Sequence, residues 1–508
     1  MPARSLIRYV TAQSQITGNG IFIFEQPPTP RFTTATGVGV GIAIAAEWGP
    51  TTAWDFTNPT AALDRYWPLG PDAAYWAIAG LPWLKPLRLI RVVGSGATAA
   101  TKTFNDVDPK ASLIATAAYS GTAGNNIYIT GTANGSDADA RDIRVRVVNG
   151  TQVMHDETYL AVQAANGAVT DPGDPYVTFT ADGSADDSCA VFAETALTGG
   201  TSGTISAANV RTALDALGGV NVQTSVVAIA GFADGIADDV NEQMDQWAAA
   251  ATGNGRVACL MTPSDDTAAN AITAVADYRN ERCRQDYPRL TRSLVYNYNG
   301  YAADGEQTTC ASLVRACAYQ YVDQHQAICL GGFPLPVSAS VTGVADTGLD
   351  LDDLAALNAA GINTWVQVEN GWAPYNDVST YLVGGLPVAG NRIRYADWVL
   401  DAFARFQQQY LGLKLDLTLS PDTLGVNTGR QIAQMSSFLD DQQAQDIIQA
   451  GENTDGTSSP AYALDAFTLM TPTKLAAGRW DLQVSIRMTP TFLQGVIYPN
   501  IAFDLNIR

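Results

Sequence analysis

Two stretches near the end of the chain alternate strictly between apolar and polar residues. The first runs from Trp480 to Met488 and the second from Ile501 to Ile507. A period of two places successive side chains on opposite faces, so both stretches predict half-buried β-strands. The final strand has two candidate partners: a local hairpin, or the sheet of another molecule to which it is added as an arm. Its apolar positions are Ile501, Phe503, Leu505 and Ile507.

A short run near the N-terminus is apolar at every position. It consists of Ile21, Phe22, Ile23 and Phe24. Such a run predicts a strand that needs cover on both faces. A domain core rarely provides that cover close to a terminus, so we expect a neighbouring subunit to supply it. The strand ends before Pro27, Pro28 and Pro30, which cannot join a β-ladder.

Predicted strands and helices alternate between residues 205 and 370, after two earlier strands at Gly37–Ile42 and Leu87–Val93. The glycines before Ile42 do not match a phosphate-binding loop, so we interpret the first of these as a closely packed central strand. Strand–helix alternation is typical of an α/β sandwich with a largely parallel sheet. The predicted helices are Ala207–Leu217, Ala237–Ala251, Asp265–Arg284 and Gly305–Gln324. The predicted strands are Gln223–Ile229, Val257–Met261, Ser293–Tyr296 and Gln326–Leu330.

Two other regions depart from this alternation. Residues 105 to about 200 are rich in Gly, Asp, Ala and Thr and contain short β runs, which predicts a β-rich insertion. The aspartate clusters of this region lack the Gly and Glu spacing of an EF-hand loop, so we expect them to form solvated turns. After Gly390, Asn391–Leu411 and Arg430–Gln449 carry apolar stripes at helical spacing and predict two long helices.

The composition narrows the classes of partner. Of the 508 residues, 46% are apolar and only 16% are charged, so we expect part of the surface to contact other protein. The formal net charge of −21 would repel both nucleic acid and anionic lipid, which argues against a nucleic-acid partner and against direct membrane insertion. No secretory signal is visible. The six cysteines form no C-x-x-C and are expected to be reduced, mostly core thiols of a protein made in a cytoplasm.

Catalytic chemistry is limited by the presence of only two histidines. We expect His155 to lie in a loop and His325 at a helix end. Neither G-x-S-x-G nor H-E-x-x-H occurs, and we predict no enzyme activity, no cofactor and no metal site. A hydrolase would have to combine Asp323 and His325 with Ser338 or Cys310. The acidic, weakly charged composition also suits a structural surface protein of the S-layer or adhesin-like type.

A series of short motifs follows a definite order along the chain. The motifs are Gly20–Glu25, Thr36–Ala46 with Gly49-Pro50, Leu89–Val93, Gly121–Asn126, Leu197–Gly203 and Leu357–Asn363. The order and spacing of this series resemble those of the contractile tail sheath proteins of phages and related injection machines. The last helices and strands resemble the sheath C-terminal domain. The resemblance covers most of the chain except residues 130–195.

The resemblance implies a fold of the α/β class. Its parts would be a subtilisin-like α/β sandwich core without protease chemistry, a β-rich insertion, and a C-terminal α+β domain. The terminal strands would be donated to neighbouring subunits. The expected segments are an N-terminal arm and linker at 1–36, the first part of the core at 37–104, an outward-facing insertion at 105–204, the α/β core at 205–389, a tube-facing C-terminal domain at 390–499, and a C-terminal arm strand at 500–508.

The resemblance also implies a mechanical function. The chain would be a virion structural protein that polymerises as stacked six-fold rings around a tail tube and contracts to drive the tube through a cell envelope. Its partners would be further copies of itself, the tail tube protein, and the baseplate and tail terminator proteins. Its location would be the virion tail, assembled in the host cytoplasm. The segment with Pro27, Pro28 and Pro30 would form a semi-rigid spacer between the arm and the body. Candidate cations for an acidic tube surface are Arg392, Arg394, Arg405 and Arg430.

Overall fold

The computed structural model divides into two compact units, residues 36–397 and residues 1–35 with 398–490, and each is considered by itself. The structure describes residues 7–10, 21–24, 39–56, 65–69, 87–108, 110–163, 169–182, 188–217, 224–249, 257–293, 296–298, 301–303, 306–309, 311–321, 341–368, 371–392, 394–395, 399, 402, 406, 426–452, 456–465, 471–473 and 483–487.

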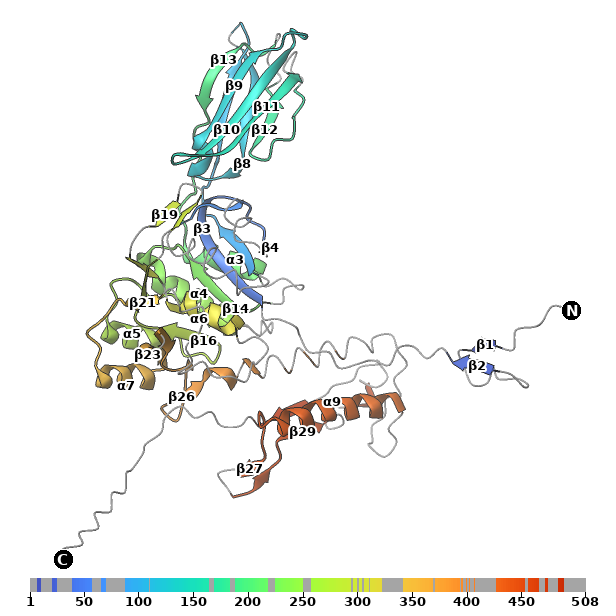
Figure 1. Cartoon of the computed structure of the whole chain (residues 1–508), viewed down its shortest axis with the longest axis vertical. Helices are drawn as coiled ribbons and strands as arrows, with labels where there is room; N and C mark the ends of the chain where they lie inside the picture. Colours follow the sequence, from blue (N-terminus) through green and yellow to red (C-terminus); the bar gives the residue numbers. More distant parts are fainter. Residues whose placement is uncertain are drawn as a thin grey trace, which may run out of the picture. The chain divides into compact units, whose positions relative to one another are not determined.

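The larger unit is built around an eight-stranded sheet in the order β22-β16-β15-β14-β3-β6-β4, with β5 paired to β3 (Figure 1). Every neighbouring pair from β22 to β6 is parallel, whereas β4 and β5 are antiparallel to their partners. The predicted largely parallel sheet is therefore confirmed. The strands are β3 Gly39–Trp48, β4 Trp54–Phe56, β5 Trp67–Leu69, β6 Leu87–Val92, β14 Thr224–Ala230, β15 Val257–Cys259, β16 Cys283–Asp286 and β22 Ile362–Asn363.

The central strand β3 explains why its sequence is apolar at nearly every position. Val40, Ile42 and Ala43 are fully buried, so both faces of the strand lie in the core. Parallel neighbours on both sides, β14 and β6, satisfy its backbone hydrogen bonds. A strand covered on both faces has a continuous apolar sequence, which agrees with the closely packed central strand predicted over Gly37–Ile42.

Helices follow the strands of the sheet. The helix predicted over Ala207–Leu217 is confirmed with the same bounds, and α3 packs against α4. Among the described residues, the helices that accompany this sheet include α3 Ala207–Leu217, η4 Asp234–Ile236, α4 Ala237–Ala249, α5 Ala268–Ala274, η5 Val275–Asp277, α6 Ala311–Tyr321 and α7 Leu351–Ala359.

Two predicted helices are wrong in part. The stretch Asp265–Arg284 contains α5 and η5, but its last two residues begin the buried strand β16. Arg284 resembles a residue of a helix surface in the sequence, but in β16 it is fully buried, and its guanidinium donates to Tyr319 OH and to backbone carbonyls. The stretch Gly305–Gln324 begins with strand β20, Glu306–Thr309, and only then continues as α6.

The predicted strand Ser293–Tyr296 is also divided. Its start lies in β17, Leu290–Ser293, which pairs antiparallel with β20 and β21, and its end lies in β18, which pairs with β19. Neither joins the parallel sheet, and Gln326–Leu330 lies outside the described residues. The remaining strands of the unit are β18 Tyr296–Tyr298, β19 Tyr301–Ala303, β21 Val341–Val344, β23 Trp365–Val368, β24 Gly371–Pro374, β25 Val378–Val383 and β26 Leu386–Ala389.

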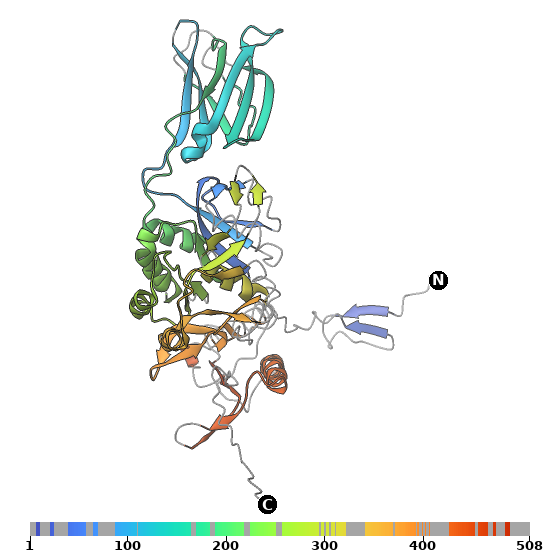
Figure 2. The same ribbon diagram turned by 60° about the vertical axis from the view of Figure 1, so that its left-hand side comes forward.

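The predicted β-rich region forms two packed antiparallel sheets, β11-β10-β9-β13 and β12-β8-β7 (Figure 2). Inward residues such as Ile129, Val145 and Phe179 form its core. The region is inserted after β6 and returns before α3. Its elements are β7 Ala99–Asn105, β8 Ala111–Ser120, η3 Thr122–Asn126, β9 Ile127–Ala133, β10 Ala140–Asn149, β11 Gln152–Gln163, β12 Val177–Ala181 and β13 Phe192–Ala196.

The chain enters and leaves this sandwich along two antiparallel segments that lie side by side. Ser95 pairs with Thr204, and Thr98 pairs with Thr201. Ser95 N donates to Thr204 O at 3.2 Å, and Thr204 N donates back to Ser95 O at 3.3 Å. The two ends of the insertion are therefore fastened to each other.

The second unit contains the strands and the long helix near the two ends of the sequence. Helix α9, Val426–Ala444, buries Met435 and Leu439 and confirms most of the helix predicted over Arg430–Gln449. Strand β30, Gln483–Ile486, lies within the predicted strand Trp480–Met488 and pairs antiparallel with β29. The described residues of the predicted helix Asn391–Leu411 are helical: 391, 392, 394 and 395 belong to the larger unit, and 399, 402 and 406 belong to the second unit. The other strands are β1 Ile7–Val10, β2 Ile21–Phe24, β27 Gly451–Glu452, β28 Ser458–Ser459 and β29 Tyr462–Asp465.

Candidate functional site

The N-terminal run is a β-strand, as its sequence predicts. Strand β2 pairs in parallel with β1, with Ile7 opposite Ile21 and Val10 opposite Phe24. The predicted donation of this strand to another subunit stays a prediction. Pro27, Pro28, Pro30 and the C-terminal strand with Ile501, Phe503, Leu505 and Ile507 lie outside the described residues.

The arginines proposed to face a tube have different environments. Arg392 is exposed at the start of its helix, and Arg430 is exposed on α9. Arg405 lies outside the described residues. Arg394 is only 4% exposed, so its guanidinium is not available on the surface of this chain. This placement corrects the prediction for Arg394, because an internal carboxylate holds the side chain.

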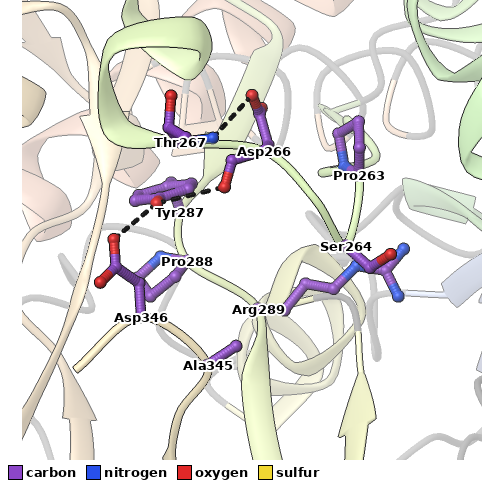
Figure 3. A pocket seen from close by; sticks show the side chains of 9 residues that line it. All are labelled: Pro263, Ser264, Asp266, Thr267, Tyr287, Pro288, Arg289, Ala345 and Asp346. Atoms are coloured by element: carbon purple, nitrogen blue, oxygen red, sulfur yellow. Dashed lines mark hydrogen bonds between the residues drawn. The ribbon is translucent and has the colours of Figure 1, made fainter. Parts of the chain in front are cut away.

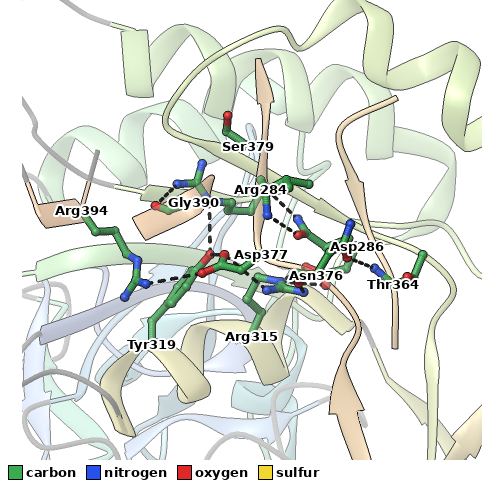
Figure 4. Close-up of polar contacts among 12 residues, drawn as sticks. Arg284, Asp286, Arg315, Tyr319, Thr364, Asn376, Asp377, Ser379, Gly390 and Arg394 are labelled. Carbon is green, nitrogen blue, oxygen red and sulfur yellow. Dashed lines mark hydrogen bonds and ion pairs between the residues drawn. The ribbon is translucent and has the colours of Figure 1, made fainter. Parts of the chain in front are cut away.

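That carboxylate belongs to a cluster of buried charges in the larger unit (Figure 4). Arg394 Nη2 lies 3.5 Å from Asp377 Oδ2. Arg315, on α6, donates from Nε to the two carboxylate oxygens of Asp286 at 2.8 and 2.9 Å. Its Nη1 lies 3.6 Å from Asp377 Oδ1. The side chains of Arg315, Asp286 and Asp377 are fully buried, so these ion pairs are shielded from water and salt.

Two more side chains tie the cluster to the beginning of the helix at residues 390–395. Arg284 Nη2 donates to Gly390 O at 2.8 Å, and Tyr319 OH donates to Asp377 Oδ1 at 2.6 Å. Burial by itself raises the pKa of Asp377, but Arg394, Arg315 and Arg284 hold that pKa below its usual value. The cluster thus joins β16 and α6 to the helix start through charged groups. Its role is structural.

A second set of polar contacts, here called the joint, links the parallel sheet to the sandwich. Glu47, near the end of β3, accepts hydrogen bonds from Thr122 Oγ1 at 2.7 Å and Thr122 N at 3.1 Å, and also from Ser202 Oγ. Arg91 donates to Ala46 O at 2.7 Å. Burial lowers the pKa of Arg91 to about 10, against the opposing effect of Glu47. Arg91 therefore stays charged near neutral pH and holds the end of β3.

Aromatic side chains extend this joint. The Trp48 ring stacks on Trp67 at 5.4 Å and on Tyr176 at 5.7 Å, and it meets Tyr119 edge-on at 5.1 Å between ring centroids. Trp48 lies on the central strand β3 and Trp67 on its antiparallel neighbour β5, yet both side chains pack into the hydrophobic core of the sandwich. The sandwich is consequently continuous with the body that carries it, because the two share core side chains.

A polar pocket of about 320 Å³ opens beyond the ends of β15 and β16 (Figure 3). Tyr287 OH donates to Asp346 Oδ2 at 2.7 Å, and Arg289 Nη2 donates to Asp234 Oδ1 at 2.8 Å. The hydroxyl of Ser264 is hydrogen-bonded to the carboxylate of Asp234, and the same carboxylate accepts a hydrogen bond from Arg289. The lining residues include no histidine or cysteine. This arrangement does not form a Ser-His or Cys-His pair.

Comparison with solved structures gives matches over nearly the whole chain. The sheath tail protein from Desulfitobacterium hafniense matches with a TM-score of 0.59 over 92% of this chain and 100% of that one, at 14% sequence identity. The chain has the fold of a tail sheath protein. The sheath tail protein from Listeria innocua matches this sheath fold with a TM-score of 0.54 at 13% identity, over 91% of this chain and 97% of that one.

The sheath fold also matches the helical sheath of the anti-feeding prophage in its contracted state. That match has a TM-score of 0.53 at 10% identity and covers 97% of this chain and 100% of the other. No family model matches the sequence, and no curated protein matches it. The similarity that these comparisons show is therefore one of fold.

The residues that fasten this sheath fold were missed by sequence reasoning, although they carry a recognisable signal. Glu47, Arg91 and Arg315 are single charged residues inside otherwise apolar runs. A charge at such a position is buried with its neighbours and needs a partner. The identity of the partner is not visible in the sequence, since Asp286 and Asp377 lie 29 and 62 residues from Arg315.

The prediction that His155 lies in a loop is wrong. His155 belongs to strand β11, and its Nε2 lies 2.8 Å from Asp174 Oδ2. Asp174 is only 8% exposed and also accepts hydrogen bonds from Tyr159 OH and from Val177 N, so it is not a solvated turn residue. His325, Asp323, Ser338 and Cys310 all lie outside the described residues.

The described residues also bear on metal binding, membrane-spanning helices and the state of the cysteines. Among the described residues, no group of His, Cys, Asp and Glu has the arrangement of a metal site. The described helices include none that is long and apolar enough to cross a membrane. Cys189, Cys259 and Cys283 are buried and form no disulfide, as expected of core thiols.

Proposed function

We propose that this chain is the subunit of a contractile sheath of a phage tail or a related injection machine. The observation that carries the proposal is the sheath fold, which extends over 92% of the chain and the whole of a sheath tail protein. In this proposal the subunits polymerise as stacked six-fold rings around a tail tube and contract to drive the tube through a cell envelope. The chain acts mechanically and is not an enzyme.

The proposed contraction is a rotation of near-rigid subunit bodies on a metastable lattice. Two features support a rigid body: the buried charge cluster around Asp377, and the aromatic joint around Trp48. Both resist bending, since a break would expose either unpaired charge or apolar surface. Rotation is then confined to the connections between subunits.

The connections are proposed to be the terminal strands. Ile21–Phe24 and Ile501–Ile507 would be shared with sheets of neighbouring subunits, and the prolines after Phe24 would space the arm from the body. The core would be subtilisin-like without the protease chemistry, and the sandwich would face outward. Further partners would be the tail tube, baseplate and tail terminator proteins. The location would be the virion tail or a phage-like particle.

The proposed contact with the tube uses exposed cations of the C-terminal region. Arg392 and Arg430 are exposed, and Arg405 remains in the proposed set. We expect Arg392→Glu with Arg430→Glu to weaken cosedimentation of the sheath with a purified acidic tube. Arg144→Glu, an exposed arginine on the sandwich, serves as the control. Unchanged cosedimentation of the double variant would remove these residues from the tube contact.

Negative-stain electron microscopy of the full-length protein at rising concentration tests the proposal as a whole. Hollow tubes or stacked rings are expected, either spontaneously or after addition of a tube template. Particles that stay dispersed at every concentration, with and without the template, would contradict a sheath function.

A further inference from the structure

The hairpin β25–β26 has a buried base and an exposed tip. Val378 and Thr380, at the start of β25, are 1% and 0% exposed, whereas Val383 and Leu386 are 58% and 71% exposed. The turn between the strands is Gly384-Gly385, with φ of 60° and 81°. Left-handed backbone at both central positions is the geometry of a tight two-residue hairpin turn, which glycine adopts without strain. The turn therefore gives the tip a defined backbone conformation.

The base of the hairpin is fixed to the body by polar contacts. Arg279 Nη1 donates to Thr380 O at 2.8 Å, and Asn280 N donates to Thr380 Oγ1 at 3.1 Å. The backbone of Gly361 approaches so closely that an added Cβ would lie 2.8 Å from Ser379 O. Because the base is held, the tip loses little conformational freedom when it contacts a partner.

The exposed face of the tip is apolar and uncharged. Val383 lies opposite Leu386 across the hairpin, and Tyr381, two residues before Val383, shares this face. Residues 378–391 contain no charged side chain, and the adjacent Asp377 is fully buried. An uncharged apolar face is therefore displayed on a chain whose formal net charge is −21.

We propose that this face docks against a second copy of this chain, an inference that rests on the proposed sheath function. Copies that each carry −21 repel one another, so close contact is favoured where neither surface adds like charge. The hairpin tip meets that condition and supplies large apolar side chains for burial. Tyr381, Val383 and Leu386 are the anchors of the contact, and surrounding residues complete its area.

The test compares two substitutions at equally exposed leucines. Leu386→Asp places a charge on the hairpin face, and Leu160→Asp places the same charge on strand β11 of the sandwich, where Leu160 is 73% exposed. The readout is the protein concentration at which half of the purified chain pellets as polymer. We expect Leu386→Asp to raise that concentration by about ten-fold or more, since an anchor leucine loses its burial. Leu160→Asp should behave like the wild type.

A second variant, Val383→Asp, should reproduce the effect of Leu386→Asp, and thermal unfolding of both variants should match that of the wild type. If the wild type assembles and both hairpin variants assemble equally well, the hairpin inference fails while the sheath function stands. An equal loss in Leu160→Asp would overturn it too, because the effect would then be one of added charge in general. Normal polymers of Leu386→Asp that no longer cosediment with a tube would show that the face binds the tube instead. If the wild type never assembles, with or without a tube template, both proposals fall.

Discussion

At the scale of single residues, the carboxylate of Asp377 serves several partners at once. It lies within 3.6 Å of Arg315 and Arg394 and accepts a hydrogen bond from Tyr319. All of these groups are shielded from water. A buried ion cluster is not a large source of net stability, but removal of one partner leaves the others charged and uncompensated.

We therefore expect Asp377→Asn to lower the free energy of unfolding by about 3–5 kcal/mol. The amide keeps the size of the side chain and removes only the charge. Denaturant unfolding followed by circular dichroism measures the change. Asp156→Asn, at an exposed pair with Arg144, is the control and should leave the unfolding midpoint unchanged. A small effect at Asp377 would mean that water reaches the cluster.

The lowered pKa of Asp377 gives this contribution a definite pH dependence. In the unfolded chain the pKa of an aspartate is about 3.9, and in the folded chain the pKa of Asp377 is lower than that. A group with a depressed folded pKa contributes its full stability above the unfolded pKa and loses it as the pH falls through the folded one. The difference in stability between the wild type and Asp377→Asn should be constant near neutrality and shrink below about pH 4. A difference that grows on acidification would contradict the assignment.

At the scale of elements, the sequence predicted a strand or helix closely where the polarity of its residues matches their burial. β3 and α3 were predicted closely because one lies wholly in the core and the other presents a single apolar stripe. β16 was missed because Arg284, Gln285 and Asp286 are polar yet buried, which inverts the usual relation between polarity and exposure. Pairings such as Glu47 with Ser202 span 155 residues, and no local pattern encodes them. The buried charge cluster could therefore be suspected from the sequence but not assembled from it.

The joint between the parallel sheet and the sandwich depends on one glycine. Gly121 has a φ of 132°, and an added Cβ would lie 2.0 Å from Glu47 O. We expect Gly121→Ala to lower the free energy of unfolding by about 2–4 kcal/mol, because it adds both backbone strain and a clash with backbone. Gly173→Ala is the matched control, with a φ of 78° and no atom within 4 Å, and should cost only about 1 kcal/mol. Thermal unfolding of the two variants measures the difference, and equal costs would mean that the joint gives way easily.

At the scale of the whole molecule, the proposed arms make assembly separable from folding. Deletion of residues 500–508 should leave a folded monomer that forms no tubes in electron micrographs. A subtler comparison uses the two faces of that strand. Phe503→Asp with Leu505→Asp should abolish polymers, whereas Ala502→Asp with Asn506→Asp should not. Ordered tubes from the deletion variant would show that the C-terminal strand is not an arm.

The hydrogen-bonded pair Ser95–Thr204 has a consequence for engineering. Because the two chain segments are already neighbours there, a two-residue turn could join Ser95 to Thr204 in a variant from which the sandwich has been removed. Any foreign domain whose ends lie equally close could be spliced in at the same position. Trp48 and Trp67 would then need polar replacements, since they lose their cover. In a polymer of such subunits, each foreign domain would be displayed once per protomer at the regular spacing of the lattice.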